Sequence, residues 1–450
     1  MLRSGQRPRV RFGPREQRGL IAGWSSGKVL LLVVSALLAI TEARILPMSV
    51  GIIAALLTMA GALASVSIPI HGRSLQAWSP IGMSFALRKL LLRKQPFEAP
   101  FDHPLPFGYR PKASRMVTKT LDCSGLSLDE CELPGMGKVA LAHDRRNRVV
   151  ALSARLHSPG GALFAGGADP QMVEAWGQLL RNLGREGSPV KHFQWMSWAE
   201  EDLFNEVLLQ RNALKRHSSL TILVAYGRRT GRRFPEAIAL AAREILDCRR
   251  LLKEYGLELS QPCSLETLAP LFNLEGQQQS FNWPLSLQEY WDHLRIDGRV
   301  AIISWIEEWP RSDREQGFLT SMLMADASSR VTVSLRPVAP SLASRQLEQE
   351  RTASIADEEI KRRGGFLSTI RRQREMEAAM FRERELADGE TLFSFAGFVG
   401  AMGSDLDEAL ASHARLEAAA SRGGMVLRRL YGEQARAAST LFPIGRGIAK

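Results

Sequence analysis

Residues 391–432, TLFSFAGFVGAMGSDLDEALASHARLEAAASRGGMVLRRLYG, contain the clearest secondary-structure pattern of the chain. A β-rich run comes first, and Ser404 or Asp405 can cap the amphipathic segment that follows it. Gly423 and Gly424 end that segment, and MVLRRLYG then has the composition of another strand. The stretch predicts a strand, a helix and a strand, in that order.

The same order of strand, helix and strand is predicted before this stretch, in a segment that starts near Trp283. VAIISWIEEW has the pattern of a strand, GFLTSMLMAD that of a helix and RVTVSLRPV that of a second strand. Two long, highly charged helices are predicted over 341–388, as an insertion between RVTVSLRPV and the stretch that starts at residue 391. This insertion could dock a partner or be a solvated helical hairpin. Two β-α-β units in succession are the order of a split βαβ, ferredoxin-like module, here over 283–450.

Residues 116–275 are compatible with the same plan, less clearly. A hairpin turning at DRRN precedes a helix that starts at Pro170, where Asp169 can cap it. SLTILVAYGRR then predicts a strand, and PEAIALAAREILDCRRLLKEYG a helix that stops at Gly256. We therefore expect an α+β fold with two ferredoxin-like modules, 116–275 and 283–450.

The formal net charge of +12 comes from the first quarter of the chain. Residues 1–115 hold 16 Lys and Arg against 4 Asp and Glu, whereas the remainder holds 43 of each. A protein that binds DNA through its main body would more often concentrate positive charge there, so direct DNA binding is not expected. The Arg-rich residues 1–28 are broken by Pro and Gly and predict a disordered arm.

Two apolar segments follow the arm, VLLLVVSALLAI (29–40) and ILPMSVGIIAALLTMAGALASVSIPI (45–70). The second has no charge over 26 residues, and about 20 residues suffice to cross a bilayer. The first could be a signal peptide, but the short gap between the segments favours a transmembrane hairpin over 29–72. Basic residues flank the pair on both sides, which predicts a two-pass protein of the cytoplasmic membrane with both termini in the cytoplasm.

Residues 73–115 predict a juxtamembrane helix and a Pro-rich linker. The helix, MSFALRKLLLRKQ (83–95), has apolar and basic residues suited to lying on an anionic leaflet. The same pattern fits a helix packed on the soluble body.

The sequence contains no clear motif for nucleotide binding, metal binding or catalysis. LPGMGKVAL (133–141) has Glu132 and Val139 where a P-loop needs Gly and Ser or Thr. The eight histidines show no metal-binding spacing, and the four cysteines, which are Cys123, Cys131, Cys248 and Cys263, are expected as buried thiols. We therefore expect no catalytic residues, metal or cofactor, and not an enzyme.

YWDHLRIDGRVAIISWIEEWPR, RVTVSLRPV and the closing segment from DGETLFSFAGF to TLFPIGRG resemble the amino-terminal, non-ATPase domain of conjugative secretion ATPases. The full layout resembles a family of actinobacterial integral membrane proteins of conjugative and type IV-like secretion clusters. The positions that match in the closing segment are Gly389, Glu390, Leu392, Gln434, Ala438, Leu441, Pro443 and Gly445. The sequence ends at Lys450, where those ATPases continue into their motor, so ATPase activity is not expected to carry over.

This resemblance implies a non-catalytic inner-membrane scaffold subunit that anchors or organises a separate P-loop ATPase. Its expected partners are that ATPase, other membrane channel subunits and further copies of the chain. Two alternatives stay open: a subunit of a type VII secretion membrane complex, and a membrane-anchored nucleotide-binding enzyme or DNA-binding tether. The candidate residues of the partner interface are Tyr431, Gln434, Ala438, Leu441, Pro443 and Gly445.

Overall fold

The structure is a computed structural model of the 450-residue chain. It describes residues 9–10, 26–70, 73–92, 126–145, 147–157, 170–201, 214–268, 287–296, 298–310, 314–315, 319–338 and 391–445, with seven further positions at 342–345, 348, 352 and 380. The chain divides into two compact units. One comprises residues 14–96, and the other comprises residues 1–13 and 97–450.

The larger unit is built on one sheet in which all pairings are antiparallel. Twelve of the described strands form it, in the order β10-β11-β12-β15-β14-β7-β8-β6-β5-β4, with β16 also pairing with β12 and β9 with β6. The strands of the first half are β4 (Leu126–Leu133), β5 (Gly137–Asp144), β6 (Val149–His157), β7 (Val190–Glu201), β8 (Leu214–Ala225) and β9 (Glu258–Pro262). Those of the second half are β10 (Leu287–Glu289), β11 (Leu294–Ile296), β12 (Arg299–Glu308), β14 (Ser329–Pro337), β15 (Phe393–Gly403) and β16 (Val426–Arg429).

The two halves repeat the same order of elements. The helices of the first half are α5 (Pro170–Gly184), α6 (Phe234–Glu254) and α7 (Leu265–Leu268), and those of the second are α8 (Thr320–Leu323), α11 (Leu406–Arg422) and α12 (Gln434–Ala438). Along the chain, each half consists of three strands, a helix, two strands, a helix, a strand and a short helix. The second half contains one additional strand, the two-residue β13 (Arg314–Glu315), which pairs with β1 (Arg9–Val10) of the basic arm. Within the sheet the order is β9-β6-β8-β7 in the first half and β16-β12-β15-β14 in the second.

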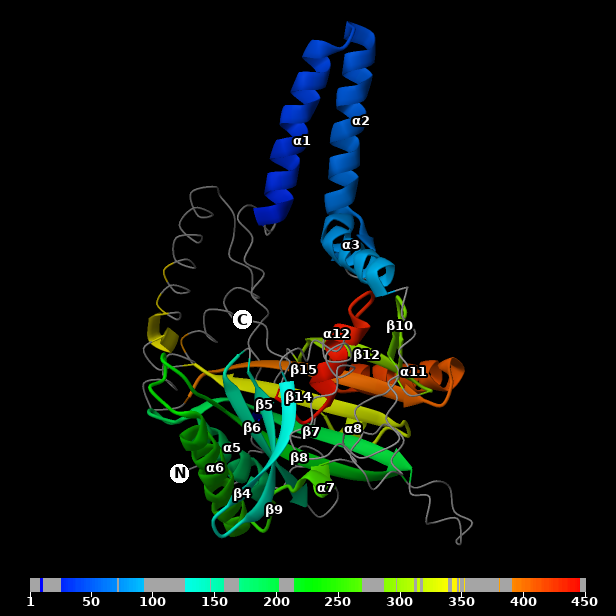
Figure 1. The fold of residues 1–450 in the computed structure, drawn as a ribbon. Helices are drawn as coiled ribbons and strands as arrows, with labels where there is room; N and C mark the ends of the chain where they lie inside the picture. Colours follow the sequence, from blue (N-terminus) through cyan, green and yellow to red (C-terminus); the bar gives the residue numbers. More distant parts are fainter. Residues whose placement is uncertain are drawn as a thin grey trace. The chain divides into compact units, whose positions relative to one another are not determined.

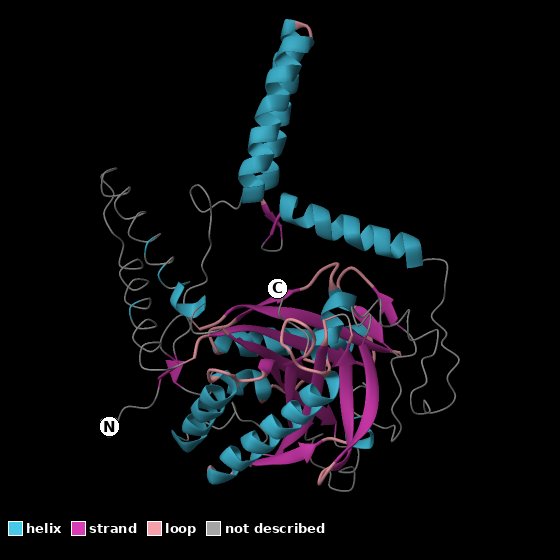
Figure 2. Ribbon diagram, turned by 60° about the vertical axis from the view of Figure 1, so that its left-hand side comes forward, coloured by secondary structure: helices cyan, strands magenta, loops and turns pink. Residues whose placement is uncertain are grey.

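The halves meet edge to edge, because β7 pairs with β14. Gln194 lies opposite Ser334, and Trp195 lies opposite Val333. Described strands before and after the predicted boundary between two modules, 275–283, therefore belong to one continuous sheet. Figure 2 shows this sheet in magenta as a curved layer, and β7 and β14 lie side by side at its centre (Figure 1).

Each face of the sheet has its own hydrophobic core. One core contains the apolar residues of α5, α6, α8 and α11, packed on strand residues such as Phe193 and Trp195. The other contains the alternate strand residues, such as Met196 and Trp198, together with residues of α7 and the C-terminal segment. Because both faces are buried, a central strand such as β12 has a nearly continuous apolar sequence.

Several predicted elements are confirmed. Asp405 caps α11 by accepting a hydrogen bond from the Glu408 N–H at 2.8 Å, and β15 and β16 flank that helix as expected. GFLTSMLMAD was expected to form a longer helix, but α8 covers only four residues. LPGMGKVAL forms the turn between β4 and β5, in which Leu133 lies opposite Gly137. Most of the predicted insertion over 341–388, the Pro-rich linker and Asp169 lie outside the described residues.

The smaller unit contains α1 (Ser26–Ile45), α2 (Met48–Ser67) and α3 (Leu75–Leu92), with two short strands, β2 (Pro69–Ile70) and β3 (Arg73–Ser74). Helices α1 and α2 lie side by side (Figure 1), and the Thr58 hydroxyl donates a hydrogen bond to Glu42 at 2.9 Å. Helix α3 begins before the predicted juxtamembrane segment and contains Pro80.

The predicted two-pass membrane topology is wrong. In the described part of the chain one helix, α2, is long and apolar enough to cross a membrane. Helix α1 contains Lys28, Glu42 and Arg44 within its 20 residues, whereas α2 contains no charged residue. Charged side chains are costly in the hydrocarbon region of a bilayer, so α2 is suited to cross a membrane and α1 is less suited. A two-pass protein with both termini in the cytoplasm is therefore not supported.

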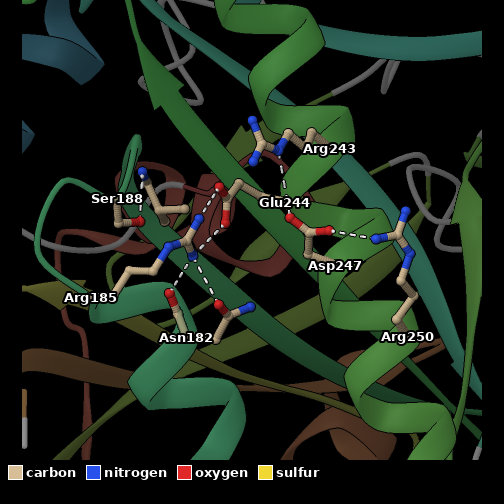
Figure 3. A network of polar contacts seen from close by, with 8 residues as sticks. Asn182, Arg185, Ser188, Arg243, Glu244, Asp247 and Arg250 are labelled. Atoms are coloured by element: carbon tan, nitrogen blue, oxygen red, sulfur yellow. Dashed lines mark hydrogen bonds and ion pairs between the residues drawn. The ribbon is translucent and has the colours of Figure 1, made fainter.

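A polar network fixes α5 against α6 (Figure 3). The Arg185 guanidinium donates two hydrogen bonds to the Glu244 carboxylate, at 2.6 and 3.0 Å, and these bonds raise the pKa of Arg185. The Glu244 side chain is only 2% exposed. A second pair lies on the same helix, where Arg250 contacts Asp247 at 3.5 Å, but the Arg250 side chain is 80% exposed.

These two pairs predict different contributions to stability. Arg185→Ala leaves the carboxylate of Glu244 buried without its guanidinium, so we expect the free energy of unfolding to fall by about 3 kcal/mol. Arg250→Ala removes an exposed pair and is expected to cost less than about 1 kcal/mol. Urea denaturation of the two variants at pH 7 measures both values. Equal losses would contradict the role of Arg185, whose own side chain is 39% exposed, as the partner of a buried carboxylate.

Candidate functional site

The candidate site is the C-terminal strap, which we define as residues 430–445. It contains α12 and a 3-10 helix, η3 (Ser439–Leu441), and it covers the sheet face opposite α5, α6 and α11. In Figure 1 it is the red segment that includes α12. Its contacts pass from β12 through β15 and β14 to β7 and β6, so it bridges both halves of the sheet.

The strap begins on β12, where Gln434 takes the place of a missing strand partner. Its side-chain oxygen accepts the Ile303 N–H at 2.8 Å, and its side-chain nitrogen donates to the Ile303 carbonyl at 3.1 Å. Ile303 lies beyond the stretch of β12 that pairs with β11 and before the stretch that pairs with β16. The buried amide of Gln434 thus gives the Ile303 N–H its acceptor, and it shares the Ile303 carbonyl with the Leu430 N–H, which donates to it at 3.0 Å.

The middle of the strap lies on β15 and β14. Leu441 packs so closely over Gly400 that a Cβ on that glycine would lie 2.4 Å from the leucine side chain. Arg330 donates to the Leu441 carbonyl at 3.3 Å, and its guanidinium lies 5.8 Å from the centre of the Phe442 ring. A glycine in β15 and an arginine in β14 therefore shape the surface for this part of the strap.

The end of the strap lies on the first half of the sheet. Gln194 of β7 donates to the carbonyls of Thr440 and Phe442, at 2.9 and 3.0 Å, and accepts the Gly445 N–H at 2.7 Å. Ser153 of β6 donates to the Pro443 carbonyl at 3.1 Å. Gln194 and Ser153 are both buried, so these bonds form away from bulk water.

Gly445 and His192 close the contact. Gly445 has a φ of +68°, and a Cβ there would lie 2.0 Å from the Leu223 side chain, so no other residue fits without rearrangement. His192 Nε2 lies 2.6 Å from the Gly445 carbonyl. Because a carbonyl only accepts, Nε2 carries the proton. Burial lowers the pKa of His192 to about 4, so the imidazole is neutral at pH 7.

A row of polar side chains crosses the sheet beneath the strap, and we call it the polar row. It comprises Ser153, Thr221, Gln194 and Ser334, which lie opposite one another on β6, β8, β7 and β14. All four are buried. The strap has irregular backbone, and its carbonyls need donors once they are removed from water. Ser153 and Gln194 of the polar row and Arg330 supply donors to these carbonyls, which explains polar residues at these buried strand positions.

The six residues predicted from the closing motif all lie in the strap, and most of them face the chain itself. Gln434, Ala438 and Leu441 are at most 2% exposed, and Pro443 and Gly445 are also buried. Tyr431 is half-buried. Their use as an interface with another protein stays a prediction, because the contacts described above are all within the chain.

Exposed aromatic residues lie beside the start of the strap. Tyr290 and Trp291, in the turn between β10 and β11, are 38% and 39% exposed. The Gly432 N–H donates to the Trp291 carbonyl at 2.6 Å, which places Tyr431 next to this turn. Arg436 on α12 is also exposed. We call Tyr290, Trp291, Tyr431 and Arg436 the aromatic surface.

The backbone under the aromatic surface is held by several contacts. Arg429 forms an ion pair with Asp292 at 3.2 Å and lies 5.5 Å from the centre of the Tyr431 ring. The Tyr290 ring stacks on His293 at 4.3 Å. The exposed rings are therefore presented by a turn that is fixed on both sides.

Sequence reasoning identified the strap by its motif but did not identify the aromatic surface or the polar row. The pair YW at 290–291 was the available signal, since two adjacent aromatic residues cannot both point to one side of an extended chain. Gln194 gave no signal, because an isolated glutamine in a strand usually indicates a solvent-facing position.

The titratable groups of the described residues do not form a metal site. No group of three or more His, Cys, Asp or Glu lies close enough to hold a metal ion in the part of the chain that the structure describes. His143 Nε2 lies 2.6 Å from the Tyr226 hydroxyl beside Phe234 of α6, on the helix face, and Cys248 and Cys263 are buried thiols whose pKa burial raises.

The His192 contact predicts a pH dependence of stability. The pKa of His192 is lower in the folded chain than its ordinary 6.5, so the folded state binds fewer protons between pH 6.5 and 4. The free energy of unfolding should therefore fall by up to about 3 kcal/mol as the pH decreases through this range. His192→Gln retains an N–H donor without titrating and should lose less stability over the same range.

Urea denaturation from pH 7 to pH 4 tests this expectation. His413 on α11 also has a pKa lowered by burial, but it is present in both chains, so the difference between the two profiles isolates His192. Parallel profiles would contradict the prediction.

The comparisons with known proteins complete the description of the site. No protein-family model matches the chain, and no curated protein is detectably similar to it in sequence. The resemblance to conjugative secretion ATPases rests on the residues quoted from the sequence, and the function has to be argued from the geometry of the strap and the aromatic surface.

Proposed function

We propose that the chain is a non-catalytic scaffold subunit of a conjugation or type IV-like secretion apparatus. In this proposal it organises a P-loop ATPase that is a separate protein, and the ATPase docks on the aromatic surface. The observation that carries the proposal is the exposure of Tyr290 and Trp291 on a turn that the strap and Arg429 hold in place. The resemblance to the non-ATPase domain of secretion ATPases supports the choice of partner.

The composition of the aromatic surface fits a protein interface. Tyr, Trp and Arg are enriched among the residues that dominate binding energy, because they bury a large area with few rotatable bonds. A turn fixed before binding loses little conformational freedom on association, which favours affinity. Trp291, the largest of the exposed side chains, is expected to contribute most.

We also infer that each half of the body is a ferredoxin-like, split βαβ module with two additional strands in front. The orders β9-β6-β8-β7 and β16-β12-β15-β14 support this inference, because each places the first and third strands of the module at its centre. The first two helices of each half, α5 and α6 or α8 and α11, lie on the same face of the sheet, which fits the same plan.

The pairing of β7 with β14 makes a rigid platform from the two modules in this proposal. These strands occupy the same position in each half, and the strap covers their junction. A scaffold needs a fixed arrangement of its binding surfaces, and a shared sheet supplies one without a flexible linker between modules.

Attachment to a membrane is proposed through α2 alone. This helix has 20 residues and no charged side chain, which suffices to cross about 30 Å of hydrocarbon.

Replacement of Trp291 tests the docking surface. The full chain carrying Trp291→Ala should co-purify with at least tenfold less P-loop ATPase than the wild-type chain, because an exposed aromatic anchor is lost while the core is unchanged. The measurement is quantitative mass spectrometry of the ATPase after detergent extraction and affinity purification from the native cell.

Leu410→Ala is the matched control, since Leu410 on α11 is 38% exposed and lies outside the aromatic surface. It should retain the ATPase. Both variants should keep the melting temperature of the wild-type chain to within about 2 °C. The proposal is wrong if the wild-type chain recovers no P-loop ATPase, or if the two variants retain it equally.

Membrane attachment is tested in the middle of α2. Leu56→Arg places a charge in the centre of the apolar segment, at a cost of about 3 kcal/mol if this segment spans a bilayer. We expect the variant to move from the carbonate-resistant membrane fraction to the soluble fraction, while Leu56→Phe stays with the membrane. Recovery of the wild-type chain in the soluble fraction would contradict attachment through α2.

A further inference from the structure

We propose that the strap is a separable peptide ligand of its own chain. In this proposal the sheet face beneath it is a groove that recognises an extended segment of the pattern Leu-Phe-Pro-x-Gly, found here at 441–445. This inference goes beyond the scaffold function and does not depend on it, because it rests on contacts within the body alone.

The first argument is that the pairing of the strands with one another does not need residues 434–445. Strands β12, β15, β14, β7, β8 and β6 each pair with neighbours on both sides. Among the described residues, no backbone-to-backbone hydrogen bond joins residues 434–445 to a strand of the sheet. Removing residues 434–445 therefore uncovers one face of the sheet and breaks no pairing between strands, while Ile303 of β12 loses its contacts with the Gln434 side chain and keeps the hydrogen bond from the Leu430 N–H.

The second argument concerns how the strap is held. Gln194, Ser153, His192 and Arg330 bind backbone carbonyls and one backbone N–H of residues 440–445 through their side chains. Grooves that bind extended peptides also hold the peptide backbone by hydrogen bonds. In such grooves the backbone contacts provide affinity, and pockets for side chains provide specificity.

The third argument concerns sequence specificity. The pocket above Gly400 accepts Leu441, and the Phe442 ring packs beside Arg330. At Gly445 the positive φ and the nearby Leu223 side chain select glycine. These three positions define what the groove accepts, so an arbitrary extended peptide should not bind well.

The strap is also tethered in a way that permits exchange. Residues 430–433 join β16 to α12, and Gly432 in this connection has a φ of +69°. A segment on such a short tether competes at an effective concentration of about millimolar, so the groove of the wild-type chain is filled by its own strap. A peptide added in solution should bind measurably only when that strap is displaced.

The experiment uses the full chain with Leu441→Asp and Phe442→Asp. These changes lie in the strap and leave all groove residues unchanged. A fluorescent peptide with the sequence of residues 434–445, QARAASTLFPIG, is titrated with this variant and with the wild-type chain, and binding is followed by fluorescence anisotropy. We expect one peptide per chain, with at least tenfold tighter binding to the variant than to the wild-type chain.

Two matched controls test the groove itself. The same peptide carrying Gly445→Ala should bind the double variant at least tenfold more weakly, because the positive φ and the contact with Leu223 disfavour a Cβ. Adding Gln194→Ala to the double variant should weaken binding of the unchanged peptide by a similar factor, since three hydrogen bonds are lost.

Circular dichroism and thermal melting of the double variant complete the test. A cooperative melt with the wild-type spectrum supports a body that folds without the seated strap. If the double variant is unfolded, the strap is part of the folding core and the inference is wrong. Equal binding of the Gly445→Ala peptide, or no binding by a folded variant, overturns it as well.

Discussion

The pairing of β7 with β14 is the interaction on which the rest of the body depends. It joins two halves with the same order of elements into one sheet, and it does so through the same strand of each half. Self-complementary contacts of this kind are familiar from symmetric dimers, where a surface pairs with its own copy. Here both copies lie in one chain. The junction has two faces, and each has to be covered by something that spans both halves.

The two faces are covered by different means. On one face the helices pack as apolar surfaces, with Arg185 and Glu244 fixing α5 to α6. On the other face the strap crosses the junction with irregular backbone, and irregular backbone brings carbonyls that need donors. The polar row and Arg330 follow from that requirement. Gln194 is central because it lies on β7, at the junction, and contacts three positions of the strap.

The strap also connects the platform to the surface that we propose for partner binding. Its first residues support the turn that exposes Tyr290 and Trp291, and its last residues end on His192 and Gln194. Its two ends therefore lie on opposite halves of the sheet. Displacing the strap would uncover the polar row and remove Gly432 from Trp291 at the same time. The groove and the aromatic surface thus share one structural support.

The sequence by itself determined the local elements and the importance of the closing motif. Asp405 and Gly423–Gly424 bound α11 because caps act through neighbouring residues, and the apolar run of α2 identifies the helix that could span a membrane. Only the tertiary structure decided that the halves share a sheet, that Gln194 is buried and that Leu441 meets Gly400. These facts depend on contacts between residues far apart in the chain, and a local pattern carries no information about which strand edges meet. The prediction of a two-pass topology is wrong for a different reason, because Lys28, Glu42 and Arg44, all visible in the sequence, make α1 unlike the uncharged α2.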